Sequence, residues 1–133
     1  GTITRDTTAG LYRTSSPSER LAPNTASFKL TGSVKRFAVA SGASATVSVY
    51  VRESVVSDGT DYNGARARLV LKANPAAGIA ADTVLATATI SSEGAFELLS
   101  GTTAAVTDDA VLEVCVDCDG TTGWVNVDDW SVA

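Results

Sequence analysis

The sequence predicts an all-β domain, an antiparallel β-sandwich of about eight to nine short strands. Runs of alternating apolar and polar residues recur along the chain, and turn formers such as Gly, Pro, Asn and Asp bound each run. Hydrophobic residues make up 44% of the chain and are mostly Val, Ala and Leu, with abundant Thr, a composition that suits pleated strands. No ten-residue stretch has the periodicity of an amphipathic helix.

We expect residues 1–133 to form a single domain. This length is that of one ordinary domain, and the sequence shows no internal repeat. Only 19% of the residues are charged, so the chain has enough apolar surface to bury a core.

The first half of the chain contains the clearest strand pattern. Residues 12–21 are expected to hold one or two edge strands between turns, and residues 27–40 one long strand or two, with Phe28 in the core. Residues 44–52 alternate most strictly. Their apolar side chains point to one face of the expected sheet and their polar side chains to the other: Ala45, Val47, Val49 and Val51 against Thr46, Ser48, Tyr50 and Arg52.

The second half carries the remaining predicted strands, separated by loops that are dense in turn formers. We expect these strands at residues 66–73, 84–90 and 96–99 and at two runs within 111–133. The last two runs flank an Asp-Gly-Thr-Thr-Gly turn, which predicts a closing β-hairpin.

Cys115 and Cys118 form a C-x-x-C pattern, which in isolation suggests redox or zinc chemistry. Residues three apart on a strand point to opposite faces, so Cys118 is expected in the core and Cys115 turned outward, unable to bond to each other. A zinc site would need ligands that a chain with no His and two Cys does not readily supply. We expect two free thiols; a disulfide between copies through Cys115 is the alternative.

The composition excludes several classes of function. Without His the chain lacks the commonest general base and every Ser-His or Cys-His pair, so we expect no enzyme. A net charge of −5 argues against a nucleic-acid partner. No run approaches the ~20 apolar residues that span a bilayer, so we expect no membrane partner.

Three stretches carry a resemblance: RTSSPSERLAPN (13–24), VSVYVRES with DYNGARARLVLKANPAAGI (47–54 and 61–79), and EVCVDCDGTTGWVNVDDWS (113–131). Their order and spacing resemble a β-sandwich module of tailed-phage structural proteins. That module is similar to jelly-roll carbohydrate-binding modules, whose last strand commonly ends in an aromatic residue and paired aspartates, here Trp124 and Asp128-Asp129. The resemblance implies a jelly roll, sugar binding in some members and often a structural calcium ion.

A candidate sugar-binding surface follows from the outward faces of the strands. Aromatic rings stack on sugar faces, and arginines and carboxylates bond hydroxyl groups in fixed geometry. The candidates are Tyr50, Arg52, Arg66, Arg68 and Glu113, with further rings from Trp124 and Tyr62 in or beside loops. They make one groove if their strands share a sheet. The alternative is an exposed face that carries cross-strand ion pairs.

Asp128 and Asp129 are the candidate calcium ligands. Adjacent strand residues point to opposite faces, so one of the two must face inward or lie on a bulge. Ca²⁺ takes six to eight oxygen ligands, and main-chain carbonyls of the N-terminal segment would complete the site that the resemblance implies. The alternative is that both carboxylates are solvated. The Asp-rich loops at residues 58–64 and 117–120 lack the complete EF-hand pattern, and we interpret them as turns.

Two functions follow from these observations. The first is a non-catalytic carbohydrate-binding module, part of a larger phage virion or host-attachment protein, with a glycan as ligand. The second is a purely structural virion module, a capsid decoration or fibre domain that contacts other virion proteins. Either predicts a virion or extracellular location.

Overall fold

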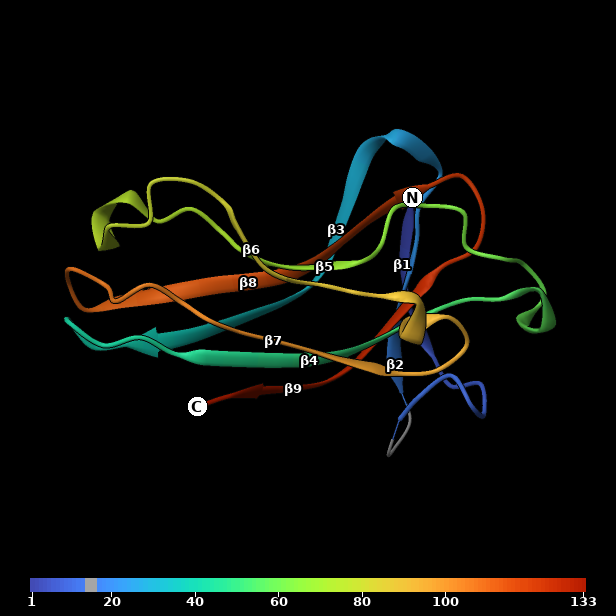
Figure 1. Ribbon diagram of the computed structural model, residues 1–133, viewed down its shortest axis with the longest axis horizontal. Helices are drawn as coiled ribbons and strands as arrows, with labels where there is room; N and C mark the ends of the chain where they lie inside the picture. Colours follow the sequence, from blue (N-terminus) through green and yellow to red (C-terminus); the bar gives the residue numbers. More distant parts are fainter. Residues whose placement is uncertain (14–16) are drawn as a thin grey trace.

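The computed structural model describes residues 1–13 and 17–133, without the side chains of Ser27 and Phe28. The strands of these residues form two antiparallel sheets packed against each other (Figure 1). The predicted antiparallel β-sandwich is confirmed. Among the described residues, no helix is both long enough and apolar enough to span a membrane.

The larger sheet has five strands. In spatial order they are β1 (Thr2–Asp6), β2 (Ser18–Ala22), β9 (Val125–Val132), β4 (Thr46–Glu53) and β7 (Glu97–Thr102). The smaller sheet has four strands, in the order β3 (Thr25–Val39), β8 (Ala110–Gly120), β5 (Arg68–Leu71) and β6 (Thr83–Thr87). Short 3₁₀ turns lie between strands: η1 (Val56–Asp58), η2 (Pro75–Ala77) and η3 (Ile90–Ser92).

Alternating residues of both sheets meet in one hydrophobic core. Val47, Val49 and Val51 of β4 are fully buried, and Val125 and Val127 of β9 join the same core from the neighbouring strand. The smaller sheet contributes fully or almost fully buried residues: Leu69, Leu71, Leu112, Val114 and Val116. Each buried Val or Leu side chain stabilises the fold by about 1.5–3 kcal/mol, and the strict alternation leaves the other face of each strand for polar residues.

The predicted closing hairpin is wrong. β8 pairs with β3 and β5 in the smaller sheet, whereas β9 pairs with β2 and β4 in the larger one, so the chain crosses between the layers after Gly120 (Figure 1). Asn63 holds the crossover, because its Oδ1 accepts hydrogen bonds from the main-chain N–H groups of Thr121 and Thr122. Alternation and a turn signal predict two strands and a reversal, but they do not say which strands pair.

The N-terminal segment differs from the prediction in one strand. β1 pairs with β2 at the edge of the larger sheet, and four of its five residues are exposed, so it has no apolar alternation to reveal it. β2 lies in the predicted strand at residues 12–21, but Thr14, Ser15 and Ser16 of that prediction lie outside the described residues. The expected core position of Phe28 also concerns a side chain outside the description.

The two cysteines are free, as predicted, and one of them lies differently from the prediction. Cys118 joins the core, and Cys115 lies on the other face of β8, yet it is only 1% exposed. Its register partner is Val70, and two neighbours on its own face, Glu113 and Asp117, form ion pairs with arginines of the flanking strands. A small side chain on a central strand is therefore covered even on the outer face.

Candidate functional site

The outer face of the five-stranded sheet gathers polar and aromatic side chains from four adjacent strands. The register places Arg20 beside Asn126, Asn126 beside Arg52, and Tyr50 beside Asp128. All four strands turn these side chains away from the core, because their neighbours in sequence, such as Val51 and Val127, face inward. The residues of this outer face are Asp6, Ser18, Arg20, Ser48, Tyr50, Arg52, Asn126 and Asp128.

Two aromatic rings on this face are each covered by an arginine. The Cζ atom of Arg13 lies 3.6 Å from the ring centroid of Tyr50. The Cζ atom of Arg20 lies 3.9 Å from the ring centroid of Trp124. A guanidinium over an aromatic face is attracted by the ring quadrupole, so both contacts stabilise the pairs.

A buried polar network supports the face near β1. Asn126 is fully buried; its Nδ2 donates to Asp6 Oδ2 at 2.9 Å and to Ser18 Oγ at 3.0 Å, and its Oδ1 accepts from Trp124 Nε1 at 2.9 Å. Burial alone would raise the pKa of Asp6, but hydrogen bonds from Asn126, Thr8 and Arg20 outweigh it and hold the pKa below its ordinary value. Asp6 therefore stays ionised beneath Arg20, whose Nε donates to its Oδ2 at 2.9 Å.

Asp128 and Asp129 lie at a bulge in β9. The pairing of β9 with β4 shifts register between Ser48 and Tyr50, and Asp129 has a φ of 53°. This conformation turns both carboxylates toward Arg13: Asp128 Oδ2 accepts from the Arg13 main-chain N–H at 2.8 Å, and Asp129 Oδ2 lies 3.2 Å from Arg13 Nε. The expectation that one of the two aspartates lies on a bulge agrees with this geometry.

The surroundings of this aspartate pair do not fit a calcium ion. The Oδ1 of Asp128 accepts from the Asp129 N–H, so N–H donors already occupy both oxygens of that carboxylate. Among the described residues, no group of three or more Asp, Glu, Cys or His side chains is placed to hold a metal. Calcium stays a prediction of the resemblance.

Arg52 lies on the outer face but is not free to meet a ligand. It is buried, and its two Nη atoms donate to Asp58 Oδ2 and Oδ1 at 2.8 and 2.9 Å. These bonds hold the pKa of Asp58 below its ordinary value. Arg52 was expected to be exposed to a ligand, but it instead forms an ion pair with Asp58 that connects β4 to η1.

The expectation of one shared groove is wrong for Arg68 and Glu113. Both lie on the outer face of the four-stranded sheet, on the opposite side of the sandwich from Tyr50. Arg68 forms a bidentate pair with Asp117, at 2.6 and 2.9 Å, and Glu113 pairs with Arg36 at 2.9 Å. This face corresponds to the alternative of cross-strand ion pairs.

Arg66 and Tyr62 lie in the loop between η1 and β5, apart from the face around Tyr50. Arg66 bonds Glu53 at 2.6 Å and Glu93 at 2.9 Å. Tyr62 is buried, donates to the Ala65 carbonyl at 2.6 Å, and accepts from the Asp119 N–H at 3.2 Å. Burial raises the pKa of Tyr62 well above its ordinary value, so its hydroxyl stays protonated. Tyr62 was expected to present a ring to a ligand, but it is buried and instead holds the loop in place.

Sequence reasoning missed the residues that cover and support the rings. Arg13 and Arg20 carry no local pattern, because their partners lie far along the chain. Asn126 did leave a signal: a polar residue between Val125 and Val127 in an alternating strand must face a polar partner or solvent.

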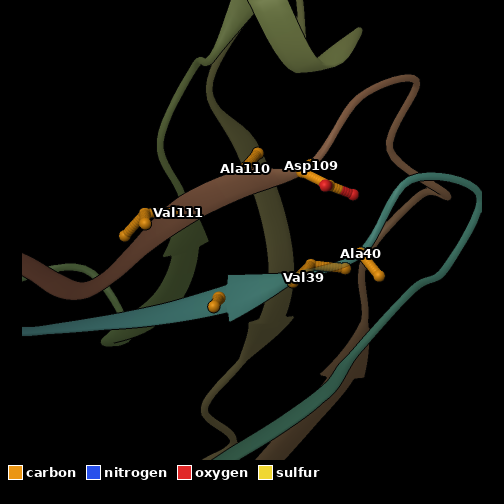
Figure 2. Close-up of a pocket in the computed structure, with 6 residues that line it drawn as sticks. Val39, Ala40, Asp109, Ala110 and Val111 are labelled. Atoms are coloured by element: carbon orange, nitrogen blue, oxygen red, sulfur yellow. The ribbon is translucent and has the colours of Figure 1, made fainter.

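A shallow apolar pocket of about 480 Å³ lies away from these rings, between the end of β3 and the start of β8 (Figure 2). Its lining consists of Ala38, Val39, Ala40, Asp109, Ala110 and Val111. The carboxylate of Asp109 accepts from the Ser41 N–H at 2.8 Å, so the only charged group of the lining holds a turn. Apart from this carboxylate, the side chains that line the pocket are apolar.

The architecture resembles that of a solved structure. That structure contains the CBM22-1 and GH10 modules of endo-1,4-β-D-xylanase 10B from Clostridium thermocellum, complexed with xylohexaose. The TM-score is 0.68 at 13% identity, over 99% of this chain and 24% of that one. The chain has a carbohydrate-binding-module-like jelly-roll fold.

The aligned part is the CBM22 module, and this chain spans about a quarter of the xylanase chain. At 13% identity the likeness concerns the fold. No known protein family and no curated protein sequence matches the chain.

Proposed function

We propose that this jelly roll is a non-catalytic carbohydrate-binding module, with its ligand site on the outer face of the five-stranded sheet. The observation that supports the proposal most is the position of Tyr50, a partly exposed ring between hydroxyl-bearing and charged side chains on a sheet face. An aromatic ring stacks on the apolar face of a pyranose, and the neighbouring polar groups bond its hydroxyls.

Tyr50 is the ring that we assign to the ligand. Its cross-strand partners are Leu98 on β7, which is largely exposed, and Asp128 on β9. Ser48 and Ser100 form the next pair along the same two strands, β4 and β7. Trp124 lies on the same side but is buried under Arg20, so it supports the face rather than presenting a free ring.

Four carboxylates with a shifted pKa serve as structural anions. A glycosidase needs two carboxylates across the scissile bond, one of which acts as an acid with a raised pKa. In the part of the chain that the structure describes, every carboxyl group with a clear shift has a lowered pKa: Asp6, Asp58, Asp82 and Asp119. Each is held by hydrogen-bond donors, as befits a structural anion.

Glycan retention by Tyr50 variants tests the proposal. Affinity gels that contain xylan, mixed-linkage glucan, mannan or soluble chitin should retard the wild-type protein on at least one polysaccharide. Tyr50→Ala should weaken that binding about tenfold, equivalent to about 1.4 kcal/mol, because the stacking surface is lost. Tyr50→Phe keeps the ring and should bind nearly as the wild type does.

Arg36→Ala is the control on the opposite sheet, where an exposed ion pair is lost without any change at Tyr50. Retention that is the same for the wild type and Tyr50→Ala would overturn the site. A second variant, Arg13→Ala, uncovers the Tyr50 ring. If neither the wild type nor Arg13→Ala is retained on any glycan, tight self-association would favour the structural virion module. The phage context and the virion or extracellular location stay predictions.

A further inference from the structure

The two arginines over the rings are held very differently. Arg20 belongs to strand β2 and pairs with Asp6, whose side chain is 3% exposed, over a Trp124 that is itself buried. Arg13 lies outside the strands, and its side chain and that of its partner Asp129 are each 33% exposed. The two arginine side chains are similarly exposed, at 28% for Arg20 and 33% for Arg13, but only the carboxylate partner of Arg13 is open to solvent. Solvent therefore competes more with the pair outside the strands, so Arg13 is the arginine that can leave its ring.

Arg13 occupies the space that a stacked sugar would need. Its Cζ lies 3.6 Å from the centroid of the Tyr50 ring, which is already van der Waals contact. A pyranose that stacks on the same ring face would require the same separation. The guanidinium and the sugar therefore exclude each other on that face.

The Asp128–Asp129 pair holds Arg13 in this position. The bulge brings two consecutive residues of one strand to the same side, which regular alternation forbids. Asp128 anchors the main-chain N–H of residue 13, and Asp129 meets the guanidinium. A non-glycine residue at a φ of 53° costs free energy, and such residues gather at binding sites and switches.

We propose that Arg13 is an intramolecular cap on the sugar-stacking face of Tyr50, held there by Asp128 and Asp129, and that a glycan stacks on this ring only after the guanidinium has moved aside. The proposal rests on the proposed function and adds a regulatory contact to its site. The capped state lowers the apparent affinity, because only the uncapped fraction is competent to bind.

Binding measurements on cap variants test this proposal. With the polysaccharide that retards the wild type, Arg13→Ala should bind about threefold to tenfold more tightly, since a partly exposed cation–π contact and ion pair no longer compete. Asp129→Asn should shift the affinity in the same direction by a smaller factor. Arg36→Ala, which removes an exposed arginine from the opposite sheet, should leave the affinity unchanged.

Weaker binding by Arg13→Ala would overturn the cap and make Arg13 a ligand contact. Equal affinity of the wild type and Arg13→Ala for the polysaccharide would overturn the cap as well. Melting curves of the variants ensure that only folded protein is compared. If the wild type fails to bind but Arg13→Ala binds, both the site and the cap are supported.

A measurement without glycan separates failure of the cap from failure of the proposed function. The NMR signal of the Arg13 Nε–H group should show a ring-current shift in the wild type that disappears in Tyr50→Leu and diminishes in Asp129→Asn. An Arg13 signal that is the same in Tyr50→Leu as in the wild type would overturn the cap, even if glycan binding is observed. A shifted signal with no glycan bound by any variant would instead contradict the carbohydrate-binding function.

Discussion

Asn126 organises the part of the ring-bearing face that surrounds Trp124. It is fully buried on the outer side of a sheet, and its amide bonds Asp6, Ser18 and Trp124 at once. A buried amide is tolerated only when its donors and acceptor are satisfied, so the three partners and Asn126 fix each other's positions. Through Asp6 and Trp124 this network also sets the place of Arg20.

Both cysteines behave as small, buried apolar residues. Burial raises the pKa of Cys115 to about 11 and that of Cys118 to about 12, so neither thiol forms an appreciable thiolate at neutral pH. We expect both to resist a disulfide-exchange reagent at pH 8 in the native protein and to react quickly in denaturant. The reaction is measured by the absorbance of the released reagent. Rapid modification of one thiol in the folded protein would contradict the buried position of Cys115.

The short turn η1 shows how an irregular element is fixed to a strand. Asp58 accepts two hydrogen bonds from Arg52 on β4 and one from the Val55 N–H, at 2.8–2.9 Å. The loop that looked like a possible cation site in sequence thus uses its first aspartate to hold an arginine. This pair removes Arg52 from the ligand surface and stiffens the end of the strand that carries Tyr50.

The ion pair between Asp58 and Arg52 makes the free energy of unfolding depend on pH in the acid range. Because Arg52 lowers the pKa of Asp58 in the folded protein, the pair stabilises the fold above the unfolded-state pKa, about 4, and this contribution is lost as the pH falls through the lower folded-state value. We expect Asp58→Asn to cost about 1–2 kcal/mol at pH 7 and to weaken the acid dependence of urea unfolding between pH 5 and 2, as estimated from charge-assisted bonds. Asp61→Asn, an exposed aspartate in the same loop, is the matched control. Equal acid profiles for Asp58→Asn and the wild type would contradict this role.

The two outer faces of the whole molecule differ in chemistry. The four-stranded face carries ion pairs between neighbouring strands, Arg36 with Glu113 and Arg68 with Asp117. The exposed Arg36–Glu113 pair contributes about 0–1 kcal/mol, whereas the Arg68–Asp117 pair is bidentate and its carboxylate side chain is only 8% exposed. The five-stranded face instead carries both arginine-covered rings, which is why we place the ligand there.

The melting temperature of the whole protein tests whether it binds calcium. The Asp128 and Asp129 carboxylates face N–H donors and a guanidinium, so we expect the melting temperature to be the same in EDTA and in millimolar Ca²⁺. An ion that bound only the folded state would raise the melting temperature with its concentration. If calorimetry shows such a rise in the melting temperature, this expectation is contradicted and the aspartate pair is again a candidate set of calcium ligands.

Local patterns predicted much of the fold. Strict alternation at residues 44–52 correctly placed Val47, Val49 and Val51 in the core and Tyr50 on the other face, because burial on one side of a strand imposes a period of two. β1 escaped prediction because Ile3 is its one apolar residue and gives no alternation, and the hairpin prediction failed because β8 and β9 belong to different sheets. Of the candidate site, the alternation predicted the outward position of Tyr50, but not that Tyr50 pairs with Asp128 or that Arg68 and Glu113 lie on the other side of the sandwich.

By itself, the sequence determined the fold class, the position of most strands and the inward or outward direction of their side chains, since these follow from local periodicity and turn chemistry. The tertiary structure alone decided which outward faces come together and which polar groups are already engaged. Arg13 and Asp129 are 116 residues apart, and only strand order and the β9 bulge place them over Tyr50. Contacts between distant parts of the chain depend on sheet pairing, which local patterns do not encode.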